Sequence, residues 1–390
     1  MNPSQKPPTR FLKRWDVLVL AVFVFYPFAC SLTRTVFPSW AGPTFGNALG
    51  DQLSTLFIFS ILALGLNVAV GYTGLLQLGI AAFFGIGVYI TGILRVPSYP
   101  FQLPFTAALV LSALGAALCG LVLGAPTLRL RGDYLALVTL GFGEVVKVTL
   151  RNLEEITAGT KGLNPIPPPH LPPWLAVPIG WLGIENSWET DYRLFYFLTL
   201  GILVIVIALL ANLENSRLGR SWVAIREDEL AATCMGINAP RAKLASFAAS
   251  AGLAGLAGCL YATKLTTTAD PNTYDFNRSI IILCCVILGG LGSLRGVLLG
   301  VLLLLGFDNI VSPQINSTLQ SWLQHLGGGV QSSAVAERLL SFSNWRLMIF
   351  GLALVAIMRF RPEGLWPSAR LQHELHWDEP RPPLPNSNSA

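Results

Sequence analysis

Charged residues are scarce in this chain. Lysine, arginine, aspartate and glutamate together make up 12% of its 390 residues, whereas a soluble domain carries about twice that share. Hydrophobic residues make up 53%, and the mean hydropathy is +0.57. This combination of little charge and much apolar surface excludes a soluble protein. The composition therefore predicts an integral membrane protein.

Motifs for catalysis, nucleotide binding and metal binding are absent from the sequence. None of the six cysteines forms a CxxC pair, so we expect neither a disulfide framework nor a metal site. There is no HExxH, GxSxG or paired-carboxylate pattern, which argues against a polytopic membrane enzyme. The GxxxxGK[ST] phosphate loop is also missing, so ATP, if it drives this protein, must bind to another chain. The small net charge of +5 reflects topology and gives no reason to expect a nucleic-acid partner.

Long apolar runs predict an all-α fold, a polytopic transmembrane helical bundle with short and glycine-broken helices. The expected spans, about ten, are 16–35, 54–71, 74–94, 102–124, 133–150, 193–212, 244–262, 279–290, 296–311 and 346–360. Several are shorter than the roughly 20 residues that a straight crossing needs. We interpret the first run as a retained span, because Pro27 and Phe28 spoil the cleavage site of a signal peptide.

The spans divide the chain into a transmembrane domain, 13–367, and two disordered tails, 1–12 and 368–390. Most of the 26 basic residues fall on the side of the membrane where the N-terminus lies. Such an excess marks the cytoplasmic side. We therefore expect both termini and the loop 213–243 in the cytoplasm, and the proline-rich loop 151–192 outside.

The longest polar stretch between two apolar runs is Asn215–Lys243. Within it, Trp222 to Met235 is predicted to form one short helix of mixed charge, which Gly236 ends. A loop helix of this kind is either simply solvated or a docking helix for a soluble partner.

The 37 glycines are too many for a bundle of straight helices. Small residues at four-residue spacing, such as Gly292, Gly296 and Gly300, favour close packing of helix backbones. Denser glycine clusters predict helix breaks, which we expect at Gly71, Gly74, Gly85, Gly87, Gly289, Gly290 and Gly292. Broken helices expose backbone groups, which a membrane tolerates only inside protein or beside water. The first cluster is therefore expected either to line a translocation path or to serve packing.

Few polar side chains fall inside the predicted spans. The candidates for a translocation path are Asn67, Tyr72, Gln77, Thr139 and Glu144. Glu144 lies three residues before Lys147, so the two side chains are placed to pair on one helix face. A charged residue inside a membrane suggests function. The alternative is that Lys147 simply extends to the membrane surface.

Five runs of the sequence resemble the LivM-type permeases of branched-chain amino-acid importers. They are GYTGLLQLGIAAFFGIGVY (71–89), LRLRGDYLALVTLGFGEVVK (128–147), GRSWVAIREDELAATCMGINAPRAKLASFAASAGLAGLAG (219–258), VILGGLGSLRGVLLG (286–300) and FRPEGLWP (360–367). The resemblance covers nearly all of residues 50–367. It implies the membrane subunit of an ATP-binding-cassette importer in the bacterial inner membrane, which translocates branched-chain or related amino acids.

The resemblance also implies partners and a coupling site. The expected partners are a LivH-type second permease, two ATPase subunits that hold ATP and Mg²⁺, a substrate-binding protein and the lipid bilayer. No cofactor is expected in this chain itself. The residues that correspond to the family's ATPase-coupling loop are Arg226, Glu227, Asp228, Glu229, Ala231, Ala232 and Gly236.

Two rival interpretations remain. UrtC-type urea permeases are close relatives that tend to carry arginine in the glycine turn, as GGRGT, whereas this chain has leucine at position 291, which favours amino acids. A stand-alone channel or ion-coupled carrier would work without ATPase subunits.

Overall fold

The computed structural model describes residues 45–127, 133–169 and 192–311, together with a few isolated positions in 23–26 and 348–366. Its elements are α2 (Phe45–Asn67), the π-helix η1 (Val68–Tyr72), α3 (Ile80–Arg95), α4 (Phe105–Thr127), α5 (Asp133–Asn152), α6 (Glu154–Thr157), the 3-10 helix η2 (Gly159–Lys161), α8 (Tyr192–Asn215), α9 (Arg217–Glu227), α10 (Glu229–Cys234), α11 (Ala239–Leu265), the 3-10 helix η3 (Pro271–Tyr274), α12 (Phe276–Gly289), α13 (Leu294–Gly306) and the π-helix η4 (Phe307–Val311). The all-helical prediction is confirmed for this part of the chain.

Four of these helices are long and apolar enough to cross a membrane. They are Leu49–Tyr72, Phe105–Pro126, Arg193–Asn215 and Ala239–Leu265, and the shorter apolar helices Ile80–Arg95 and Phe276–Gly289 accompany them. The predicted spans 16–35 and 346–360, both tails and much of the loop 151–192 lie largely or wholly outside the described residues. The number of spans in the whole chain therefore stays a prediction.

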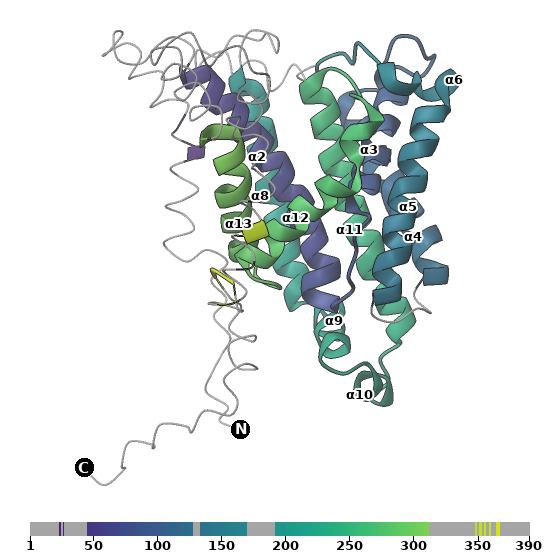
Figure 1. The fold of residues 1–390 in the computed structure, drawn as a ribbon, viewed down its shortest axis with the longest axis vertical. Helices are drawn as coiled ribbons and strands as arrows, with labels where there is room; N and C mark the ends of the chain where they lie inside the picture. The colour runs from purple at the N-terminus through teal and green to yellow at the C-terminus, as the bar shows by residue number, and fades with distance from the viewer. Residues whose placement is uncertain are drawn as a thin grey trace, which may run out of the picture.

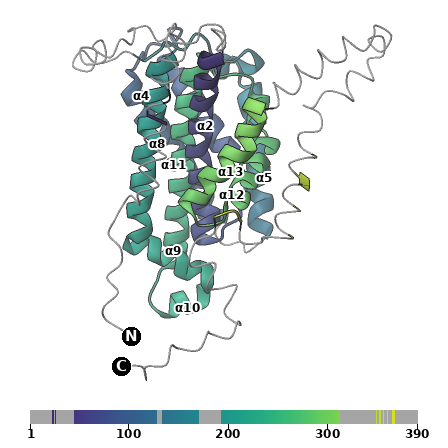
Figure 2. The ribbon, with the colours of Figure 1, turned by 90° about the vertical axis from the view of Figure 1, so that its left-hand side faces the viewer.

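Helix α11 lies at the centre of the bundle and packs against α2, α3 and α4 (Figures 1 and 2). Small residues bring these backbones into contact. A Cβ added to Gly87 of α3 would lie 2.5 Å from the Cα of Gly255 in α11, and one added to Gly258 would lie 2.3 Å from the carbonyl oxygen of Phe84. The close packing expected from the glycine spacing is thus present.

The predicted helix breaks at Gly85 and Gly87 are wrong. Both residues lie inside α3, which is continuous from Ile80 to Arg95. Their missing side chains leave room for neighbours, since a Cβ on Gly85 would lie 3.0 Å from the ring of Tyr274. The chain instead lacks regular secondary structure over 74–79, which the predicted span 74–94 counted as helix.

The two ends of the bundle differ in character. The short helices α6 and η2 lie at one end, and α9 and α10 project from the opposite end (Figure 1). Helices α12 and α13 form an antiparallel hairpin, in which Gly296 faces Gly289 and Gly300 faces Cys285. The turn of this hairpin, 290–293, contacts the end of α2, where the backbone N–H of Gly292 donates to Asn67 Oδ1 at 2.9 Å.

Candidate functional site

The polar loop forms two helices, α9 and α10, instead of the single helix predicted from Trp222 to Met235. The break is at Asp228, whose backbone is extended (φ −152°). Its carboxylate accepts hydrogen bonds from the N–H groups of Leu230 and Ala231 at 2.8 and 3.0 Å. Aspartate competes in this way with helix continuation and starts a new helix. Gly236, with φ +85°, follows the end of α10, as expected.

One face of the α9–α10 unit is fixed to the bundle. Trp222 is 1% exposed, and its indole N–H donates to the carbonyl oxygen of Ala242 in α11 at 2.8 Å. Ile225 packs beside it and is also buried. Lys243 of α11 forms an ion pair with Glu229 at 2.7 Å. These contacts hold an otherwise polar loop in one position.

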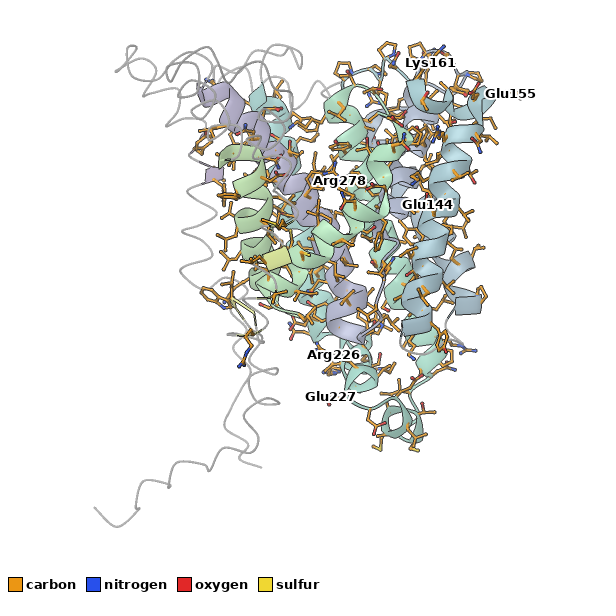
Figure 3. All side chains as sticks on the ribbon, in the orientation of Figure 1. Glu144, Glu155, Lys161, Arg226, Glu227 and Arg278 are labelled. Carbon is orange, nitrogen blue, oxygen red and sulfur yellow. The ribbon has the colours of Figure 1, made fainter. Side chains whose placement is uncertain are left out.

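The opposite face of the unit is exposed. Among the predicted coupling residues, Glu227, Asp228, Ala231 and Gly236 are exposed, Arg226 and Glu229 are half-buried, and Ala232 is buried. Figure 3 shows Arg226 and Glu227 at the end of the bundle opposite Glu155 and Lys161. Two residues that sequence reasoning missed are Leu230 and Met235, which are 77% and 83% exposed. They are the two large apolar side chains between Asp228 and Gly236, in the most polar part of the loop, and that was the signal that could have identified them.

Replacing Asp228 by alanine is expected to loosen α10. The variant loses an N-terminal cap that is worth about 1 kcal/mol. Hydrogen exchange of the amides in 229–234 should therefore become about five times faster. D228S restores a capping hydroxyl and is the control. Exchange in D228A equal to that of the wild type would show that the Asp228 carboxylate does not hold this helix.

The candidate path residues gather around the non-helical segment 74–79, with the exception of Glu144. Asn67 and Tyr72 precede the segment, and both are buried. Gln77 lies within it and accepts a hydrogen bond from Ser250 of α11 at 3.0 Å. Thr139 of α5 accepts one from the N–H of Leu78 at 3.1 Å.

This cluster offers uncharged polar groups inside the bundle. The side-chain nitrogens of Asn67 and Gln77 are buried without a hydrogen-bond partner. Buried amides of this kind are costly unless another group satisfies them. The arrangement can accept a polar ligand or a rearranged backbone, and its ionisable members are limited to the phenol of Tyr72.

Glu144 lies apart from this cluster. It is five residues beyond Thr139 on α5, on the exposed side of that helix, whereas Thr139 is buried. Its carboxylate pairs with Lys147 at 2.5 Å, as the spacing predicted. The structure therefore does not bring Glu144 together with the other four candidates.

The remaining predicted breaks meet at one point. Gly71 lies in η1, and Gly74 follows with φ +69°. Gly289 ends α12, and the φ angles of Gly290 and Gly292 are +119° and +78°. A Cβ on Gly71 would lie 2.7 Å from the backbone nitrogen of Gly292, so the two breaks are in contact.

Helices of membrane-spanning length indicate a polytopic membrane protein, and helix breaks that meet inside the bundle are typical of transporters. The family model for the permease component of the branched-chain amino acid transport system matches residues 49–358. The chain belongs to this family.

Curated relatives agree with this assignment. The high-affinity branched-chain amino acid transport system permease protein LivM of Escherichia coli K12 is 35% identical over 338 residues, which is 83% of this chain and 71% of the relative. The LivM protein of Salmonella typhimurium matches with the same identity and coverage. A probable LivM permease of Methanocaldococcus jannaschii is 25% identical over 342 residues, or 80% of this chain and 90% of that protein. No solved structure matches the chain.

Proposed function

We propose that this chain is the membrane-spanning permease subunit of an ATP-binding-cassette importer that translocates branched-chain amino acids. The family and the names of the relatives support this substrate class. The lack of a phosphate-binding loop supports the idea that separate ATPase subunits hold ATP and Mg²⁺. This subunit would then be a transporter component and not an enzyme.

The proposed assembly contains a LivH-type second permease, two ATPases and a substrate-binding protein in the bacterial cytoplasmic membrane. Both chain termini and the α9–α10 unit would face the cytoplasm, in keeping with the excess of basic residues on that side. The loop that holds α6 and η2 would face outward. The buried amides and hydroxyls around 74–79 would meet the polar groups of an amino acid whose side chain is apolar.

The observation that carries the proposal is the exposed tip of the coupling loop. Leu230, Met235 and Glu227 are all exposed on a unit that the bundle holds in place. Exposed apolar side chains with a polar rim are typical of protein contact sites. An ordered tip of this kind fits a groove on a soluble ATPase subunit better than it fits a merely solvated loop.

The double variant L230D/M235D is expected to lose its ATPase subunits. Two carboxylates in the centre of an apolar contact would stay without partners, which costs several kcal/mol. Copurification of the ATPases with the tagged permease should fall at least about tenfold. The control is L153D/I156D, which puts the same two charges on exposed apolar residues at the opposite end. Full retention of the ATPases by L230D/M235D would refute docking at this tip.

The substrate class is tested by uptake in a strain that lacks the chromosomal transporter. Labelled leucine should enter cells that carry this chain with its partners, and unlabelled leucine should compete whereas urea and polar amino acids should not. Competition by urea would instead favour a urea permease. The sequence argues against that alternative, because Leu291 stands in the glycine turn where urea permeases tend to carry arginine. Uptake by the chain alone in liposomes would instead support a stand-alone carrier.

A further inference from the structure

Arg226 differs from its neighbours in the coupling loop because its side chain points into the bundle. It lies in the last turn of α9 and is half-buried. Its Nη1 donates a hydrogen bond to the carbonyl oxygen of Gly71, a residue 155 positions earlier. Figure 3 shows Arg226 beside the lower end of α2, with the exposed Glu227 farther from it. Its guanidinium therefore belongs to an internal contact.

The backbone carbonyl group of Gly71 lies at a helix end, where it needs a hydrogen-bond donor from outside the helix. The π-helix η1 continues α2 to Tyr72, and the chain is then non-helical over 74–79. The last carbonyls of a helix lack N–H partners within it and carry partial negative charge. A cationic donor at this position satisfies the carbonyl and stabilises the helix end.

The same guanidinium borders the turn between α12 and α13. A Cβ added to Gly292 would lie 3.4 Å from Arg226 Nη1, and one added to Gly74 would lie 3.3 Å from Arg226 Cγ. The turn is also joined to α2 through the hydrogen bond from Gly292 to Asn67. Arg226 thus stands where the two breaks in the transmembrane helices meet, and glycines leave the space that it occupies.

The middle of α9, one helical turn before Arg226, is attached to α11 by the buried side chain of Trp222. A displacement of α9 must therefore move Arg226 relative to Gly71 or carry Gly71 with it. We propose that Arg226 is a positioning residue that transmits movement of the coupling loop to the break after α2 and to the α12–α13 turn. This inference rests on the proposed function and gives Arg226 an internal role instead of a contact with the ATPase.

The test uses the complete complex of both permeases, the ATPases and the binding protein in vesicles. R226A should retain its ATPase subunits and continue to hydrolyse ATP, but leucine uptake per ATP should fall about tenfold, a typical size for coupling between sites. R226K should recover part of this loss, because an ammonium reaches the Gly71 carbonyl but lacks the planar guanidinium beside Gly292. Neither change is expected to alter the KM for leucine.

Hydrogen exchange distinguishes transmission of movement by Arg226 from a purely structural role of this residue. ATP should change exchange in 217–234 of both wild type and R226A, whereas the accompanying change in 286–297 should occur in the wild type and vanish in R226A. If R226A yields no folded complex, the same measurement is made on R226K. A change in exchange in 286–297 as large as in the wild type would overturn the proposal.

Two further outcomes would overturn it. Loss of the ATPases from R226A, as from L230D/M235D, would make Arg226 a docking contact. Wild-type uptake per ATP in R226A would show that the link transmits nothing. A wild-type complex without any ATPase would instead refute the proposed function, so the two failures are distinguishable.

Discussion

Replacing Gly300 by alanine is expected to prevent the α12–α13 hairpin from closing. The added Cβ would lie 2.0 Å from the carbonyl oxygen of Cys285 and 2.9 Å from the nitrogen of Gly289. Both are backbone atoms, so no side chain can rotate away, and the helices must separate. Overpacking of a core costs about 1–3 kcal/mol and occasionally more. We expect the yield of monodisperse protein and its melting temperature in detergent to fall sharply.

The matched control for this prediction is G201A. Gly201 lies in α8, a helix of membrane-spanning length, and a Cβ there meets nothing within 4 Å. The chemical change is identical, and alanine is the better helix former by about 1 kcal/mol. G201A should therefore melt at or above the wild-type temperature. Equal melting of G300A and G201A would show that α12 and α13 do not touch at this position.

Gly300 and Gly85 show which features of the fold could be predicted from the sequence and which could not. The apolar runs predicted the helices because a backbone in lipid must satisfy its own polar groups. The four-residue spacing likewise predicted contact between helices. Whether a glycine ends a helix or admits a neighbour depends on atoms far away in the sequence. Gly85 makes room for Tyr274, and Gly74 adopts a positive φ, yet both lie in one glycine-rich run.

The structure of the coupling loop could likewise be predicted only in part from the sequence. Its charge, its location between apolar runs and its end at Gly236 could be read from the sequence. The break at Asp228 could not, since an aspartate is compatible with either an exposed position within a helix or a cap. The contact between Arg226 and Gly71 was also out of reach, because only the fold brings α9 to the end of α2. The resemblance to the family's coupling loop grouped Arg226 with Glu227, whereas in the structure Arg226 contacts Gly71 and Glu227 is exposed.

The largest effect on the coupling loop is expected from W222A. Trp222 is among the largest fully buried side chains, and it joins α9 to α11 through its indole N–H. Truncating a buried tryptophan costs about 3–5 kcal/mol. Because the loop has few other attachments, we expect this cost to appear as local opening and not as unfolding of the bundle. Amide exchange in 217–234 should rise by more than about a hundredfold, and the ATPases should be lost on purification.

Two variants separate the anchoring role of Trp222 from a general loss of apolar surface on α9. L218A removes a large apolar side chain from the same helix, but Leu218 is 50% exposed, so exchange and ATPase binding should stay near wild type. W222F keeps an aromatic ring and removes the hydrogen bond to Ala242, which costs about 1–3 kcal/mol and should give an intermediate result. If W222A bound ATPases as well as L218A does, the position of α9 would not depend on its attachment to α11. The loop would then dock as a flexible segment, and a rigid link from Trp222 to Arg226 could not transmit its movement.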